Sequence, residues 1–237
     1  MPLGTATVVD VGCNVGEALA LMGTLGVPHL RGVDINPAAV DAARRNLGAC
    51  ADVVIAHASA ERVPFPDGCA DLVLCLEMLE HVPAGLRPAA VAEMRRLLRP
   101  GGRLILTVPH RGAFAWLDPE NVRFRFPRLY AWASRRMGGA GKDAGYAGQS
   151  HGPVEHHHFT VGELEVLLDG GFAIRARIGR GCLLGPLGSW LAWPFYRRNA
   201  QAHGLYRAVS RMMQADYAVR YPLLLAYNSI LVADRTT

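Results

Sequence analysis

The chain has 237 residues, a length that fits one sizeable globular domain with a full hydrophobic core. Hydrophobic residues make up 51% and charged residues 19% of the chain, which excludes wholesale disorder. The formal net charge is +5. The basic residues are spread along the chain rather than gathered on one predicted face, which argues against nucleic acid as a partner.

The cysteines and the N-terminus indicate the compartment. Five cysteines are scattered without any C-x-x-C spacing, which favours reduced thiols over a disulfide framework or a zinc–cysteine cluster. The first ten residues, MPLGTATVVD, lack the charged region and apolar core of a signal peptide. No run reaches the roughly 18 apolar residues that a spanning helix needs. We therefore expect a soluble, cytoplasmic protein.

The first hundred residues alternate strand and helix patterns. β-branched runs predict strands, and apolar residues at intervals of three to four predict helices. The Asn36-Pro37 pair marks one helix start, and Arg99-Pro100-Gly101-Gly102 marks another helix end. The predicted strands cover 6–11, 30–35, 51–57, 70–76 and 103–109, and the predicted helices cover 16–25, 36–48 and 84–98. This alternation predicts a parallel, doubly wound sheet.

The regular pattern breaks twice in the second half of the chain. Residues 110–158 are rich in Arg, aromatics, Gly and His, and we expect them to form an insertion over the carboxyl edge of the sheet. A helix then follows Thr160, with Glu163 as capping partner, and 172–178 is a sixth strand. Residues 180–222 read as a second, irregular, Trp-rich insertion before a last strand at 226–234. We predict one domain, 1–237, with these two insertions.

The turn DVGCNVG, residues 10–16, indicates the kind of ligand. It carries Gly12 and Gly16 but lacks the G-x-G-x-x-G pattern that lets a pyrophosphate approach bare backbone. Asp10, two residues ahead of the turn, would repel a pyrophosphate and suit a cation. A ligand with an ammonium or sulfonium group and an adenosine fits better. Asp34, at the end of the second strand, is placed for ribose hydroxyls, but dinucleotide enzymes have an acid there too.

Five blocks in order then resemble one family. They are VVDVGCNVG, GVDINP, SAERVPFPDGCADLVLCLEMLEHVP, RRLLRPGGRLILTVP and HHHFTVGEL. The chain resembles the class I S-adenosylmethionine-dependent methyltransferases, in the branch that acts on small molecules and on quinone or lipid precursors. The resemblance implies an α/β Rossmann-like sheet of seven mostly parallel strands, the last antiparallel, with helices on both faces. It also implies S-adenosylmethionine as cofactor and S-adenosylhomocysteine as product.

The resemblance implies roles for individual residues at the cofactor. Asp10 and the backbone at Gly12 would hold the methionine end, Gly16 would permit close helix packing, and Asp34 would bind the ribose. The remaining implied cofactor residues are Cys13 and Asn14 in the turn, Ile35 on one adenine face, Ser59 and Ala60 at the adenine edge, and Cys75 and Leu76 along the methionine. Asn14 replaces the usual middle glycine and Ser59 a common Asp, so we expect weakened cofactor binding. The helical segment that usually precedes the first strand is missing, so residues 110–158 are the expected lid.

The candidates for acid–base chemistry are a glutamate and several histidines. The resemblance places Glu77 and His81 at the acceptor pocket, and His110 follows the fifth strand. A base is needed only if the acceptor is protonated. Glu77 could equally cap the following helix, and His81 could make a structural hydrogen bond. In EHHHF, adjacent histidines point different ways and no acid is suitably spaced, so we expect no metal site; His151, His156, His157 and His158 would anchor loops or contact substrate.

These patterns predict transfer of a methyl group to an oxygen or nitrogen of a small molecule. The strand-four sequence CLEML lacks the N/D-P-P-F/Y signature of enzymes that methylate base amino groups. The two basic-aromatic insertions suit a membrane surface or a glycosylated or lipid-linked acceptor, or else form a subsidiary core over the site. Two alternatives stay open: a non-catalytic cofactor-binding or scaffold protein on this fold, and a nucleotide-cofactor oxidoreductase.

Overall fold

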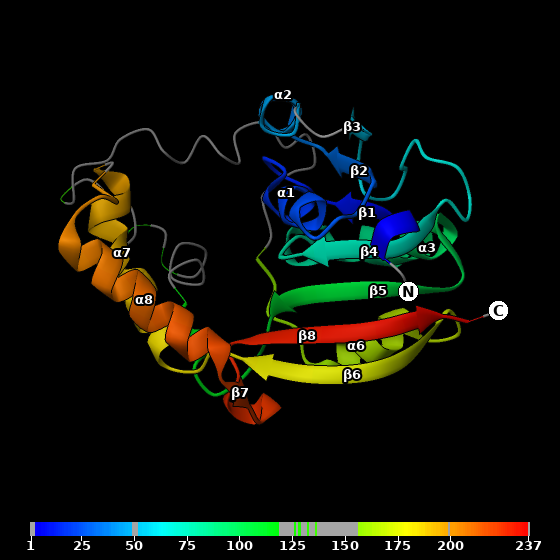
Figure 1. Ribbon diagram of the computed structural model, residues 1–237. Helices are drawn as coiled ribbons and strands as arrows, with labels where there is room; N and C mark the ends of the chain where they lie inside the picture. Colours follow the sequence, from blue (N-terminus) through cyan, green and yellow to red (C-terminus); the bar gives the residue numbers. More distant parts are fainter. Residues whose placement is uncertain are drawn as a thin grey trace.

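An eight-stranded sheet organises the protein (Figure 1). This computed structural model describes residues 3–48, 52–118, 156–198 and 200–236, with the single positions 126, 128, 132 and 136. The strand order is β3-β2-β1-β4-β5-β8-β6-β7. The strands are β1 (Thr7–Val11), β2 (His29–Asp34), β3 (Val53–His57), β4 (Ala70–Leu76), β5 (Leu98–Pro109), β6 (Phe172–Arg180), β7 (Arg220–Tyr221) and β8 (Asn228–Arg235).

The strand directions confirm the predicted doubly wound sheet. β1 to β5 pair in parallel, and β8 runs antiparallel to both of its neighbours, β5 and β6. The sheet has one strand more than predicted, because the two-residue β7 pairs with the end of β6. The chain crosses from β3 back to β4 beside β1, so the order reverses there. Ligands of open α/β sheets bind at this point, beyond the carboxyl ends of the strands.

Helices cover both faces of the sheet. The helices are α1 (Glu17–Thr24), α2 (Pro37–Asn46), α3 (Arg87–Leu97), α6 (Val161–Leu168), α7 (Leu184–Arg197) and α8 (Gly204–Ala218), with short 3-10 turns at Leu3–Thr5, Leu79–His81, Ala84–Leu86, Ala115–Leu117 and Leu223–Leu225. Successive strand residues face opposite sides, so Val8 packs in the core under α1 and α2, and Val9 packs in the core under α3 and α6.

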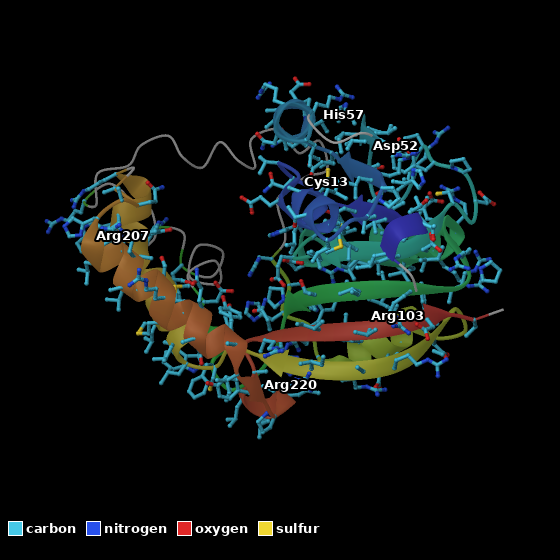
Figure 2. All side chains as sticks on the ribbon, in the orientation of Figure 1. Cys13, Asp52, His57, Arg103, Arg207 and Arg220 are labelled. Atoms are coloured by element: carbon cyan, nitrogen blue, oxygen red, sulfur yellow. The ribbon has the colours of Figure 1, made fainter. Side chains whose placement is uncertain are left out.

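Local sequence signals act where they were expected. The Asn36 side chain accepts a hydrogen bond from the backbone N–H of Ala38 and caps α2. Thr160 and Glu163 form a reciprocal capping box at the start of α6. Arg103 on β5 donates to Asp234 on β8 at 2.7 Å, which ties the antiparallel strand to the parallel part of the sheet (Figure 2). β5 begins at Leu98, directly after α3, so the Arg-Pro-Gly-Gly segment that was expected only to end the helix is already part of the strand.

The prediction of an irregular segment at 180–222 is wrong, because α7 and α8 form a helical pair there. Figure 1 shows this pair standing beyond the edge where the parallel strands end. Gly188 lies where the two helices meet, and a Cβ atom there would come within 2.3 Å of Met213 Cγ. Small residues that suggest a broken helix in the sequence thus permit close helix packing in the structure.

Asp216 of α8 fixes the start of α7. Its buried carboxylate accepts hydrogen bonds from the backbone N–H groups of Cys182 and Gly185 at 2.8 and 2.9 Å, and from the Tyr221 hydroxyl at 2.7 Å.

Among the described residues, no helix is both long and apolar enough to cross a membrane. The predicted lid at 110–158 lies mostly outside the described residues, as does His151.

Candidate cofactor and acceptor site

The turn between β1 and α1 is held tightly against its neighbours. The backbone N–H groups of Gly12 and Cys13 both donate to the carbonyl of Val33 on β2, at 2.8 and 2.9 Å. Gly12 has φ +85°, and a Cβ atom there would lie 2.3 Å from Met78 Cγ. Gly16 has φ +86° and would bring a Cβ atom within 2.7 Å of Leu47 beyond α2. Both positions therefore require glycine.

Asp10 presents a buried carboxyl group just before this turn. The residue is 2% exposed, and its Oδ1 atom has no hydrogen-bond partner among the described residues. Burial, and secondly the negative charge of Asp34, raises the pKa of the Asp10 carboxyl to about 7. A buried carboxyl group with spare acceptor capacity suits a cationic group or a hydrogen-bond donor.

Asp34 joins the turns that follow β1 and β2. One carboxylate oxygen accepts from the backbone N–H of Asn14 and the other from that of Asn36, each at 2.8 Å. Asn14 has φ +45°, a conformation that asparagine tolerates better than most residues. The position that departs from the family's glycine thus keeps the left-handed backbone of the turn, and its amide holds Asp34 in place.

The remaining predicted cofactor residues surround the same edge. Ile35, Ser59, Ala60 and Leu76 are half-buried at the ends of β2, β3 and β4. The Ile35 carbonyl lies 2.9 Å from His57 Nε2 (His57 is labelled in Figure 2). Cys13 is buried in the turn, and the Cys75 side chain is fully buried in the core, so only the backbone of Cys75 faces a ligand at this edge.

Glu77 lies at the end of β4 in an unusual backbone conformation. Its φ is +51°, which is rare for a residue with a long side chain. Its backbone N–H donates to the Thr107 carbonyl at 3.0 Å, and its carboxyl group hydrogen-bonds Thr107 and Asn228. Glu77 keeps exposed surface, yet burial by the surrounding protein raises the pKa of its carboxyl group. The end of β4 thus carries an accessible carboxyl group with a raised pKa, a combination that is frequent at functional sites.

Glu80 is a buried acid that the sequence reasoning did not single out. It is 1% exposed, and burial together with the charge of Glu77 raises the pKa of its carboxyl group well above the ordinary value. Its Oε1 atom lies 3.7 Å from His81 Nε2. The 3-10 turn Leu79–His81 turns this side chain inward, a change of direction that no local sequence signal marks.

The two candidate histidines differ in accessibility. His81 is half-buried, and its ring centroid lies 5.3 Å from that of His156. His110 is 6% exposed and pairs with Phe159 in an isolated parallel bridge. Burial lowers the pKa of His110, which favours the neutral imidazole. His81 is therefore more accessible than His110, and the role of each remains a prediction.

A third group of side chains joins distant parts of the chain. Asp118 Oδ2 lies 3.0 Å from His156 Nε2 and 2.8 Å from His158 Nε2. His157, between the two, instead contacts Glu163 Oε1 at 3.2 Å. The sequence signal that was missed is the H-x-H spacing of His156 and His158. In an extended segment alternate residues point to the same side, so these two histidines can meet one partner. The acid that meets them, Asp118, is 38 residues away in the chain.

Known proteins resemble this chain in both sequence and fold. A family model for a methyltransferase domain matches residues 9–106. A ubiquinone biosynthesis O-methyltransferase of Paraburkholderia xenovorans is 37% identical over 132 residues, 52% of this chain and 54% of that protein. The protein of the same name from Pseudomonas paraeruginosa is 33% identical over 190 residues, 69% of this chain and 76% of that protein. The crystal structure of an S-adenosylmethionine-dependent methyltransferase from Mesorhizobium loti has a TM-score of 0.59 at 18% identity, covering 99% of this chain and 94% of that one.

The chain therefore belongs to the class I S-adenosylmethionine-dependent methyltransferases. It spans about half the length of the first relative and about three quarters of the second. The crystal structure, at 18% identity, shares the fold. The acid before the glycine turn and the acid that ends β2 lie at the same edge of the sheet, and their role in cofactor binding remains a prediction.

Proposed function

We propose that the protein transfers the methyl group of S-adenosylmethionine to a hydroxyl oxygen of a small molecule in biosynthesis. The observation that carries this proposal is that the buried Asp10 carboxyl group and the Asp34 carboxylate lie close to each other beside a glycine turn. Two acids at this edge suit a ligand with a positive charge and a ribose, and they oppose a pyrophosphate. The names of the two relatives, both O-methyltransferases, favour oxygen over nitrogen as the acceptor atom.

The cofactor would lie across the ends of β1, β2 and β4. Asp10 would face the cationic methionine end, and a positive charge there would lower the pKa of Asp10 and release its proton near neutral pH. Asp34 would accept from the ribose hydroxyls while it keeps the Asn14 and Asn36 amides. Ile35 and Ser59 would contact the adenine.

The chemical step is a displacement at the methyl carbon. The acceptor oxygen attacks this carbon, the carbon–sulfur bond breaks, and its electron pair neutralises the sulfonium, which leaves S-adenosylhomocysteine. The hydroxyl proton passes to a base. Glu77 is the base we propose, because its raised pKa makes it a stronger base than an ordinary carboxylate and its surface is accessible. Alignment of the two reactants supplies much of the remaining rate enhancement.

The acceptor we propose is hydrophobic or anionic, for example a lipid-linked or glycosylated intermediate met at a membrane surface. α7 exposes Leu184, Leu187 and Leu191, which share one helix face. The neighbouring helix α8 exposes Arg207, labelled in Figure 2, and Arg211. Exposed leucines on one helix and arginines on its neighbour suit an anionic membrane surface. The free thiols among the described cysteines fit the reducing cytoplasm.

The membrane part is tested by sedimentation with vesicles. The protein should pellet with phosphatidylglycerol vesicles at low salt and less with neutral phosphatidylcholine vesicles. Leu187→Ser combined with Leu191→Ser should release it, whereas Val166→Ser, at a still more exposed apolar position on α6, should have no effect. Recovery of the unmodified protein in the supernatant at low salt would refute membrane contact.

The transfer reaction is tested with isotopically labelled S-adenosylmethionine and a panel of phenols, hydroxylated quinone precursors and amines. We expect the label in a methyl ether that survives alkali, with Glu77→Gln slowing turnover at unchanged cofactor affinity. Cofactor binding without transfer to any member of the panel would favour the non-catalytic alternative. Label on the amines alone would contradict the choice of oxygen.

A further inference from the structure

Asp118, His156 and His158 form a compact group of possible metal ligands. Asp118 follows the 3-10 turn after β5, and the two histidines lie in the extended segment before α6. One atom from each residue lies within 4.8 Å of the other two. Asp118 and His158 are buried, and His156 is nearly so. The group is thus held inside the protein by two separate segments.

From this arrangement we infer that the three side chains bind one divalent transition-metal ion. Both histidines direct Nε2 at the same carboxylate oxygen, at 3.0 and 2.8 Å. Donor atoms that share a tetrahedral ion at about 2.0–2.2 Å lie roughly 3.4 Å apart. The three ligand atoms here lie within 4.8 Å of one another, so a small adjustment of the side chains would let all three meet an ion. Two imidazoles and one carboxylate favour zinc, iron, cobalt or nickel over magnesium.

The surroundings of His158 and Asp118 match those of metal ligands in proteins. The Nδ1 atom of His158 lies 3.2 Å from the backbone carbonyl of His110, a contact that orients the ring and leaves Nε2 for the metal. The Tyr227 hydroxyl is hydrogen-bonded to Asp118, which orients the carboxylate in the same way. The expectation that EHHHF holds no metal assumed diverging side chains, whereas His156 and His158 converge.

The ion would lie on the acceptor side of the site. The His156 ring is 5.3 Å from that of His81, and the charges of both His156 and Asp118 act on Glu77. On the proposed function, the ion would bind the acceptor hydroxyl and lower its pKa, so that its proton passes to Glu77 before the oxygen attacks the methyl carbon. This role rests on the proposed function; the metal site itself does not.

The test is a titration of the chelator-treated full chain with Co²⁺, followed by visible d–d absorption. We expect one equivalent to bind, Zn²⁺ to displace it, and Mg²⁺ to leave the spectrum unchanged. Asp118→Asn and His158→Gln, which retain hydrogen-bonding groups, should each weaken binding by more than the roughly 10–100-fold typical of a lost outer-shell partner. His157→Gln is the matched control and should bind Co²⁺ like the unmodified protein, because His157 contacts Glu163.

Absence of the absorption band in the unmodified protein would overturn the inference, as would equal losses in His157→Gln and His158→Gln. If the variants fail to fold, X-ray absorption of the Zn²⁺-loaded unmodified protein decides instead: two imidazoles support the site, and fewer refute it. S-adenosylmethionine binding is measured separately on the same samples. Metal binding without cofactor binding would refute the proposed function and leave the metal site standing.

Discussion

Replacing Asp10 by Asn should stabilise the ligand-free protein at alkaline pH. The ordinary pKa of this carboxyl group is 3.8, and in the folded protein burial and the charge of Asp34 raise it to about 7. Between these values the unfolded chain loses a proton that the folded protein keeps, so stability falls as the pH rises. The difference corresponds to about 4 kcal/mol above pH 7 and about 1.6 kcal/mol at pH 5.

Asn resembles the protonated carboxyl group in shape and has no charge. The gain in unfolding free energy from Asp10→Asn should therefore be about 2–3 kcal/mol larger at pH 8.5 than at pH 5. Urea denaturation of both proteins at the two pH values, followed by tryptophan fluorescence, measures this difference. An equal effect of the substitution at pH 5 and pH 8.5 would refute the raised pKa. The same variant should bind S-adenosylmethionine more weakly, since the cationic end loses its counter-charge.

Three further predictions test the packing at the glycine turn and the hydrogen bonds at two helix starts. Gly12→Ala should lower the unfolding free energy by about 2–4 kcal/mol, because the added Cβ meets Met78 at 2.3 Å. Gly26→Ala, at a position with similar φ and open space around it, is the control and should lower the unfolding free energy by about 1 kcal/mol. Equal losses of the two variants in urea denaturation would contradict the close contact at Gly12. Thr160→Ala should cost about 1 kcal/mol through the lost cap and leave cofactor affinity unchanged in calorimetry. Asp216→Ala should accelerate amide hydrogen exchange across α7, because the N–H groups of Cys182 and Gly185 lose their acceptor. Unchanged exchange in this variant would show that Asp216 does not hold the start of the helix.

The parallel half of the fold was predictable because its signals are local. β-branched runs marked the strands, and Asn36, Thr160 and Glu163 marked helix starts that the structure has at the same positions. The acid before the glycine turn pointed to a cation rather than a pyrophosphate for a reason of charge alone. The antiparallel direction of the last strand came from the family resemblance, since no pattern within the strand encodes it.

The parts that were missed depend on contacts between distant residues. Residues 180–222 were expected to be irregular, whereas they contain α7 and α8, and Gly188 of α7 packs against Met213 of α8. Glu80 was not singled out, because its burial depends on the turn at Leu79–His81. The convergence of His156 and His158 on Asp118 requires two segments that only the folded chain brings together.

The most direct test of the account is a calorimetric titration with S-adenosylmethionine, S-adenosylhomocysteine and NADH, repeated on Asp34→Ala. Since Asp34 also holds the Asn14 and Asn36 amides, thermal unfolding of the variant must accompany the titration, and Asp41→Ala, on the exposed side of α2, is the matched control. We predict binding of both sulfur ligands, loss of that binding in the folded Asp34→Ala variant, and no binding of NADH. Binding of NADH, or sulfur-ligand binding unchanged by Asp34→Ala, would contradict the assignment of this edge of the sheet as the cofactor site.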